Sequence, residues 1–334
     1  MNKDLIILPR GNHSAVCSVK NGNIIEHTPL SFPGMSRFSI NEKWISCITK
    51  KGRNISLIKI ENKSEFIHHL TISLPSEGKT KFYAKATKIV KDTLYLGGSG
   101  GKEIIGMYDL RREQTEWIPL TVPDMVIRRR KSIDDFIVDN DRLIAVDNRV
   151  FPKWLLLYDI SKPEKPQLKD HYRLEHHGPY EHIKMATIGL NWIAILSSTT
   201  GRSGYHDHIS LLDKKYLKED SVLNCNHYRT DRMTSSNIYW GNISFLGDLL
   251  LITSSNGIGV LDFNGLKKSR YASRNKKRFF YCFPKTIIGD SILKIIPIKI
   301  SNEIIVVSQK SDKIFSTLVS KEELLSAERS FHDC

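Results

Sequence analysis

Five of the 12 histidines fall in one stretch of the chain together with carboxylates, a combination that can bind a transition metal. The histidines are His176, His177, His182, His206 and His208, and the neighbouring acids are Glu175, Glu181 and Asp207. On an extended strand, the spacing of His206 and His208 turns both rings to the same side. No helix-based or CxxC ligand spacing accompanies them. Three interpretations stay open: a metal site at His176, His182, His206 and His208, a pH-sensitive contact patch, or ordinary loop histidines.

Asp134 and Asp135 stand at the start of an apolar stretch and are the strongest candidates for acid–base chemistry. Paired carboxylates serve as general acid and base in glycoside hydrolysis, and His206 is a further candidate catalytic residue. The alternative is charge balance against the basic run just before them. The chain has no GxSxG elbow, P-loop, HExxH motif or GxGxxG opening a helix. The sequence therefore predicts no cofactor and favours a protein that is not an enzyme.

Two basic runs point to anionic partners. The first is Arg128, Arg129, Arg130 and Lys131. The second extends from Lys267 to Lys285, has eight basic residues and no acid, includes Arg274, Lys276, Lys277 and Arg278, and is interleaved with aromatic residues. Basic side chains beside aromatic platforms can bind single-stranded nucleic acid. A solvated outer strand and a surface for an acidic protein explain the same pattern.

The overall composition agrees with an anionic partner. The net charge is +14, and 40% of the 334 residues are apolar, as in an ordinary globular protein. No apolar run is long enough to span a bilayer, and the first residues do not have the pattern of a signal peptide. The five cysteines are scattered, and Cys17 and Cys47 lie in apolar strand patterns typical of buried thiols. These features predict a cytoplasmic protein without a membrane span.

The elements that must position these residues repeat along the chain. A polar turn followed by a short β-run occurs seven times, and the anchors are 39 to 57 residues apart. The first apolar residues of the runs are Leu5, Trp44, Leu94, Leu143, Trp192, Leu249 and Ile304. A second strand follows each anchor, and in four copies it ends in an acid, namely Asp109, Asp159, Asp213 or Asp262. We interpret each as a turn starter that bonds its own backbone two residues on, rather than as a metal ligand.

Four short strands in roughly 50 residues resemble the blades of β-propeller repeat proteins, although no WD40 or kelch signature is present. The resemblance implies an all-β fold: a single β-propeller domain over 1–334, with seven four-stranded blades or, alternatively, six. The module at Leu5 lacks a preceding strand, so we expect the N- and C-terminal strands to combine in one closing blade. A short helical or irregular tail is expected at 321–334.

In such a blade, loops between the second and third strands lie at the same end as the connections between blades. This geometry gathers basic loops on one face. The residues expected to bind a partner there are Arg128, Arg129, Arg130, Lys131, Arg149, Lys153, Arg274, Lys276, Lys277 and Arg278. The sequence thus predicts a non-enzymatic interaction platform for an acidic protein surface or another anionic macromolecule. The alternatives are nucleic-acid binding and a propeller hydrolase or lyase with a site at the channel mouth.

Overall fold

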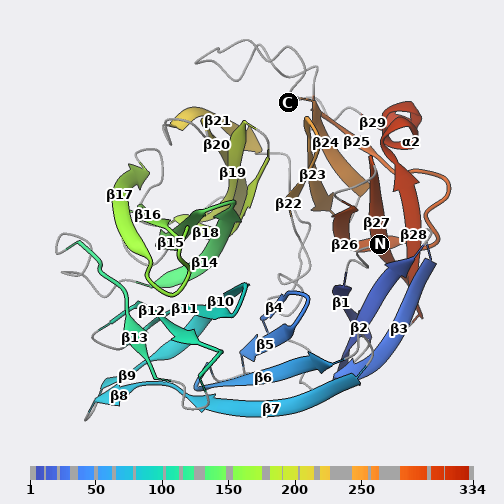
Figure 1. Cartoon of the computed structure of the whole chain (residues 1–334). Helices are drawn as coiled ribbons and strands as arrows, with labels where there is room; N and C mark the ends of the chain where they lie inside the picture. Colours follow the sequence, from blue (N-terminus) through green and yellow to red (C-terminus); the bar gives the residue numbers. More distant parts are fainter. Residues whose placement is uncertain are drawn as a thin grey trace. The chain divides into compact units, whose positions relative to one another are not determined.

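The computed structural model of the chain is almost entirely β-strand, as predicted (Figure 1). By contacts the chain divides into two compact units, Met1–Pro179 and Tyr180–Cys334, which we call unit 1 and unit 2 and describe separately. The structure describes residues 5–10, 13–20, 23–30, 37–48, 52–61, 65–77, 80–100, 103–112, 116–123, 132–147, 153–174, 181–189, 191–201, 204–213, 219–225, 243–254, 257–262, 279–298, 302–311 and 313–330.

In the described part of unit 1, strands that follow one another in the chain pair antiparallel in four sheets, with a small hairpin between sheets 2 and 3. Sheet 1 consists of β1 (Leu5–Arg10), β2 (His13–Lys20) and β3 (Asn23–Leu30), and sheet 2 of β4 (Phe38–Ile40), β5 (Trp44–Ile48), β6 (Asn54–Glu61) and β7 (Glu65–Ser73). The hairpin consists of β8 (Ser76–Glu77) and β9 (Thr80–Lys81). Sheet 3 consists of β10 (Tyr83–Val90), β11 (Thr93–Ser99), β12 (Ile105–Asp109) and β13 (Ile118–Pro119), and sheet 4 of β14 (Ile133–Asp139), β15 (Arg142–Asp147), β16 (Lys153–Asp159) and β17 (Gln167–Leu174).

The described part of unit 2 has three sheets of the same up-and-down kind. Sheet 5 is β18 (Glu181–Ile188), β19 (Trp192–Gly201), β20 (Gly204–Asp213) and β21 (Glu219–Cys225); sheet 6 is β22 (Ile243–Leu246), β23 (Leu249–Ser254), β24 (Gly257–Asp262), β25 (Phe279–Cys282) and β29 (Arg329–Ser330); sheet 7 is β26 (Ser291–Ile298), β27 (Glu303–Lys310) and β28 (Lys313–Ser320), followed by helix α2 (Lys321–Ser326). No helix in the described residues is long and apolar enough to cross a membrane.

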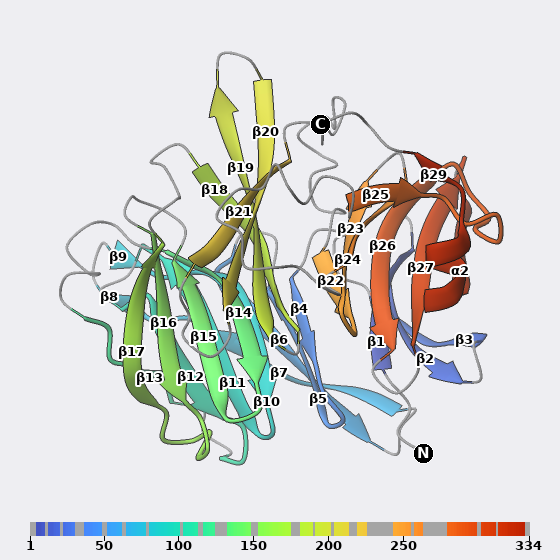
Figure 2. The ribbon, with the colours of Figure 1, turned by 90° about the horizontal axis from the view of Figure 1, so that it is seen from above.

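Within each unit, neighbouring sheets stack through apolar cores. Sheets 3 and 4 lie face to face in Figure 2, and Tyr95 and Met107 of sheet 3 share a core with Leu143 and Leu156 of sheet 4. In unit 2, Leu249 of sheet 6 shares a core with Ile304 of sheet 7. Because both faces of a sheet are covered, the central strands are apolar on both sides; β5, for example, is buried along its whole length. Cys17 and Cys47 are fully buried, as expected.

The first strand of most sheets contains a β-bulge, in which one extra residue interrupts the ladder. The interruptions lie between Ala84 and Ala86 in β10 and between Ile133 and Asp135 in β14, and β18 and β26 have the same irregularity. Two residues apart, Ala84 and Ala86 would face the same way on a regular strand. Here Ala84 packs in the core between sheets 2 and 3, and Ala86 packs in the core between sheets 3 and 4. The bulge therefore shifts the alternation by one residue, so that Ala84 and Ala86 face different cores.

The pairing register also shows which strands of a four-stranded sheet are present in the three-stranded sheets 1 and 7. The β2–β3 ladder shifts between Val16 and Cys17, as the third–fourth ladders of sheets 2, 4 and 5 do. The β1–β2 ladder is regular, as second–third ladders are. Thus β1, β2 and β3 correspond to strands two to four, which agrees with the missing preceding strand at Leu5. In sheet 7, β26 carries the first-strand bulge, so its described strands correspond to strands one to three.

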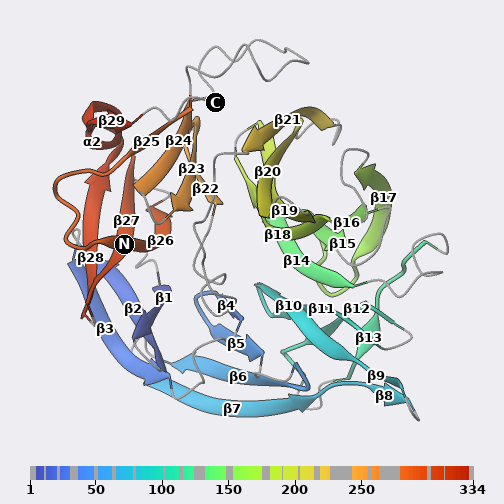
Figure 3. The ribbon, with the colours of Figure 1, turned by 180° about the vertical axis from the view of Figure 1, so that it is seen from behind.

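The C-terminal segment of unit 2 joins sheet 7 to sheet 6. Ser320 caps α2 by accepting a hydrogen bond from the Glu323 amide, Leu324 is buried, and the Lys321 ammonium lies 2.6 Å from an Asp248 carboxylate oxygen. β29 then pairs with β25 as a fifth strand of sheet 6 (Figures 1 and 3). Within unit 2, this last described strand of the chain therefore belongs to sheet 6.

The turns between first and second strands of sheets 3, 4 and 6 begin with the same left-handed backbone conformation. Lys91, Asn140 and Gly247 each begin a two-residue turn with φ of 53°, 49° and 58°, and each is followed by an aspartate. These left-handed values favour glycine or asparagine, the residues found at two of the three positions. The polar turn that revealed the sequence repeat is therefore a structural signature.

Two of the four aspartates that close the third strands are described in detail and behave as predicted. Asp109 accepts a hydrogen bond from the Arg111 amide at 3.1 Å, and Asp159 accepts one from the Ser161 amide at 2.9 Å. Each carboxylate thus starts its turn through the backbone two residues on.

Candidate functional site

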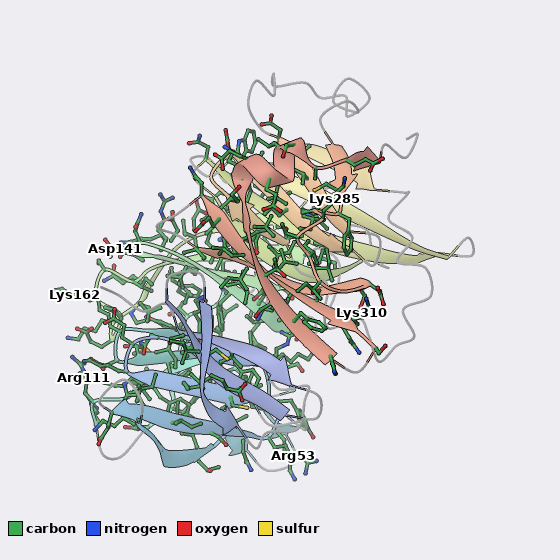
Figure 4. The ribbon with its side chains drawn as sticks, turned by 90° about the vertical axis from the view of Figure 1, so that its right-hand side faces the viewer. Arg53, Arg111, Asp141, Lys162, Lys285 and Lys310 are labelled. Atoms are coloured by element: carbon green, nitrogen blue, oxygen red, sulfur yellow. The ribbon has the colours of Figure 1, made fainter. Side chains whose placement is uncertain are left out.

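The up-and-down order gives each sheet of unit 1 two distinct ends. We call the end with the two-residue turns at Lys91 and Asn140 the turn end, and the opposite end, with the β5–β6 loop at Arg53, the loop end. In Figure 4, Arg111, Asp141 and Lys162 lie together at the turn end, and Arg53 lies away from them. Basic loops were predicted to gather at the loop end.

Most of the basic residues assigned to that end lie outside the described residues. They are Arg128, Arg129, Arg130, Lys131, Arg149, Arg274, Lys276, Lys277 and Arg278. Lys153 is the exception, and its position differs from the expected exposed loop. It is the first residue of β16, and its side chain is 0% exposed. The β16 strand begins earlier than the sequence suggested, and this withdraws the ammonium of Lys153 from the surface.

The described histidines of this cluster lie in strands, whereas one of the three interpretations placed them in loops. His182 lies in β18, His206 and His208 lie in β20, and His176 is outside the described residues. β19 and β20 are long because the ladder continues to Gly201 and Gly204. Across it, His182 pairs with Ser198, which pairs with Asp207, so His182 shares no register row with His206 or His208. In the part of the chain that the structure describes, no three potential ligands are grouped to hold a metal.

Asp134 and Asp135 have separate partners. Asp134 is the extra residue of the β14 bulge; its Oδ1 lies 3.2 Å from Lys85 Nζ and accepts a 2.9 Å hydrogen bond from Ser132 Oγ. The Asp135 Oδ1 accepts a hydrogen bond from the next amide of its own strand, Phe136 N, at 2.8 Å. Asp134 therefore acts as an acceptor in both contacts, and its cation comes from sheet 3.

The bulges of sheets 3 and 4 are joined by an arginine that the sequence did not single out. Arg37, just before β4 of sheet 2, donates from Nη1 to the main-chain oxygens of Lys85 and Asp134. Both acceptors are bulge residues, whose backbone groups a bulge frees from the ladder, and a freed carbonyl needs another donor. Arg37 thus links the first strands of three consecutive sheets while its side chain remains exposed.

A second contact joins the β5–β6 loop to β10. Gly52, with φ of 63°, accepts a hydrogen bond from the Ala84 amide at 2.8 Å, and a side chain at Gly52 would meet the Ala84 oxygen at 2.7 Å. This close approach places the neighbouring residue, Arg53, beside β10. Its guanidinium carbon lies 5.7 Å from the centre of the Tyr83 ring. Arg53 is exposed, as is Lys81 just before β10. We call Arg37, Arg53, Lys81 and Lys85 the loop-end cluster.

Several cations at the turn end have carboxylate partners. The Arg111 guanidinium makes a bidentate contact with Asp109, at 2.9 and 2.7 Å, and Lys43 lies 3.3 Å from Asp92 of the next sheet. The hydrogen bond from the Arg111 side chain holds the pKa of Asp109 below its usual range. Among the described residues, by contrast, Arg37, Arg53 and Lys81 form no ion pair. Arg37, Arg53 and Lys81 therefore differ from Lys43 and Arg111, although the exposed Lys162 and Lys165 at the turn end also have no ion pair among the described residues.

The sequence did contain a signal for the bulges. Ile133 and Phe136 both pack in the core between sheets 3 and 4, and Ile292 and Ile295 both pack in the core between sheets 6 and 7. A spacing of three between core residues within a strand indicates one inserted residue, because a regular strand alternates every two. Read in this way, the pattern would have marked Asp134. Nothing in it identifies Arg37.

No protein-family model matches the chain, and no curated protein matches its sequence. Among solved structures, it is similar to a putative 6-phosphogluconolactonase from Bacteroides uniformis, with TM-score 0.63, 11% identity and coverage of 98% of this chain and 96% of that one. It is also similar to hydrazine synthase of Kuenenia stuttgartiensis, with TM-score 0.61, 11% identity and coverage of 94% of both chains. A protein from Lactobacillus plantarum has TM-score 0.57, 10% identity and coverage of 100% and 96%.

These solved structures are propeller-type folds, and identities this low show the fold alone. Together with the repeated four-stranded antiparallel sheets, they establish the predicted all-β, β-propeller fold class.

Proposed function

We propose that this β-propeller is a non-enzymatic interaction platform whose loop end binds an acidic protein surface. The observation that carries the proposal is the loop-end cluster, in which exposed Arg37, Arg53 and Lys81 form no ion pair among the described residues. Exposed cations without counter-charges attract an acidic partner and steer its approach.

The rest of the chain supports the same choice. The net charge is +14, and the basic run from Arg128 to Lys131 belongs to the connection between sheets 3 and 4, which the strand order assigns to the loop end. At the turn end, Lys43 and Arg111 have carboxylate partners. A partner of opposite charge is therefore drawn to one end of unit 1 in preference to the other.

The contacts of Asp134 favour a binding role over catalysis. General acid–base work needs a carboxyl group that can exchange a proton with a substrate. Asp134 is instead held by Lys85 and Ser132, and Asp135 is bonded to its own strand.

Charge reversal at the two ends tests the proposal. Arg53→Glu combined with Lys81→Glu should weaken binding of a labelled polyglutamate peptide by about tenfold, since each exposed charge contributes up to about 1 kcal/mol. Lys162→Glu with Lys165→Glu is the matched control, because both lysines are exposed at the turn end. Its affinity should stay within about twofold of the unmodified protein. Fluorescence anisotropy at low and physiological salt measures both.

Equal weakening by the two double variants would contradict the assignment to the loop end. A single-stranded oligonucleotide of the same net charge serves as the competing probe. Tighter binding of the oligonucleotide, with an affinity that falls steeply with salt, would replace the acidic protein by nucleic acid as the partner.

A further inference from the structure

Within the loop-end cluster, Arg37 differs from the other cations because its guanidinium is fixed by the fold. Nη1 donates to the main-chain oxygens of Lys85 and Asp134, which belong to two different strands, β10 and β14. A group held on two rigid strands keeps its orientation before any ligand arrives. This pre-organisation lowers the entropy that binding must remove.

The same two bonds leave part of the guanidinium available. Both use Nη1, so among the described residues the hydrogens on Nε and Nη2 have no acceptor. These two nitrogens form one edge of the planar group, which matches the two oxygens of a carboxylate or phosphate. Arg37 is also exposed, so such a ligand can reach it from solvent.

The charge around this edge distinguishes a monoanion from a dianion. Lys85, whose main-chain oxygen accepts one of the Arg37 hydrogen bonds, has its ammonium 3.2 Å from Asp134 Oδ1, and the Asp134 carboxylate neutralises it. Arg37, Lys85 and Asp134 together carry a single positive charge. That balance suits one carboxylate, whereas a phosphate dianion would remain half neutralised.

We infer that the Nε–Nη2 edge of Arg37 is an anchor subsite that takes the carboxylate of an aspartate or glutamate side chain in a bidentate contact. The inference rests on the proposed function for the identity of the partner. Arg37 then determines specificity through its planar fork, while Arg53 and Lys81 contribute charge alone.

Replacing Arg37 with lysine distinguishes the effect of the paired guanidinium donors from the effect of the positive charge. Arg37→Lys keeps the positive charge but loses the paired donors, so polyglutamate affinity should fall at least about tenfold. Arg112→Lys is the matched control, because Arg112 is exposed at the turn end with a 66% exposed side chain. Its affinity should stay within about twofold. Thermal unfolding of both variants shows whether Arg37→Lys still folds.

A second measurement uses the unmodified protein and needs no macromolecular partner. The ¹⁵N-edited signal of the Arg37 Nε–H, assigned by its absence in Arg37→Lys, is followed during titration with acetate and, separately, with inorganic phosphate. A saturable shift with acetate that exceeds the shift with phosphate is expected, while the Arg112 signal stays in place.

Each outcome then has one meaning. If Arg37→Lys binds polyglutamate as well as the unmodified protein does, the bidentate anchor is wrong while the proposed function stands. If acetate leaves the Arg37 signal unmoved, or phosphate moves it further, the carboxylate subsite is overturned. If polyglutamate fails to bind but acetate moves the signal, the proposed function fails and the carboxylate site survives.

Discussion

Gly97 shows at the scale of one residue why a glycine-rich stretch need not be a loop. A run with four glycines between Gly97 and Gly101 is typical of a loop, but Gly97 and Gly98 lie buried in β11. A Cβ at Gly97 would meet Ile133 Cγ2 at 2.4 Å, so glycine is required for β11 to approach sheet 4. Glycine marks both loops and close backbone approaches, and only the packed neighbour separates the two.

This contact predicts coupling between Gly97 and Ile133. Gly97→Ala should lower the free energy of unfolding by about 1–3 kcal/mol through overpacking. Ile133→Ala should lower it by about 2–5 kcal/mol by leaving a cavity. In the double variant the new methyl group enters that cavity, so the combined loss should be smaller than the sum by about 1 kcal/mol. Urea denaturation of the four proteins measures the coupling.

Gly97→Ala with Leu57→Ala serves as the additive comparison, since Leu57 packs in the core between sheets 2 and 3. If the losses of unfolding free energy are additive in Gly97→Ala/Ile133→Ala, as they are expected to be in Gly97→Ala/Leu57→Ala, then position 97 does not need glycine for packing against Ile133.

At the scale of elements, local turn chemistry was predictable and contacts between sheets were not. The role of Asp109 and Asp159 followed from an acid placed just after an apolar strand. Arg37 could not be found in this way, because its acceptors lie 48 and 97 residues further along the chain. Such a contact exists only once sheets 2, 3 and 4 are packed. The length of β20, and hence the strand position of His206 and His208, was missed for another reason: the outer part of the β19–β20 hairpin is polar and has no apolar strand pattern.

The turn aspartates predict how stability depends on pH. The Arg111 hydrogen bond lowers the pKa of Asp109, and the Ser161 amide lowers the pKa of Asp159. Their unfolded-state values are about 3.9, so each folded-state pKa lies below its unfolded-state value. Their contribution to stability is therefore present at neutral pH and is lost as pH falls through the folded-state values. The free energy of unfolding should decrease below about pH 4.

Asp109→Asn and Asp159→Asn check this dependence. Each variant should be less stable than the unmodified protein at pH 7, and the difference should shrink as the pH approaches 3, because the native carboxylates then become protonated. Asp141→Asn, at an exposed turn-end position, provides the comparison. A stability difference that stays constant from pH 7 to pH 3 would show that these aspartates act through shape rather than charge.

At the scale of the whole molecule, the sequence predicted the fold class through its period. Seven anchors, each opening a polar turn and an apolar run, correspond to seven described sheets. The pairing of β29 was beyond prediction, because two residues added to the edge of β25 have no periodic signal. The predicted basic face depended on loops that mostly lie outside the described residues.

The central claim is that the exposed cations of the loop-end cluster make the loop end the binding end. Zero-length cross-linking of polyglutamate carboxylates to lysine amines, followed by peptide mass spectrometry, tests the claim without any substitution. Lys81 reports on the loop end, and Lys162 and Lys165, which are also exposed, report on the turn end. The account predicts cross-links at Lys81 that disappear at high salt, with few at Lys162 or Lys165. Cross-links at Lys162 and Lys165 as frequent as those at Lys81 would contradict it.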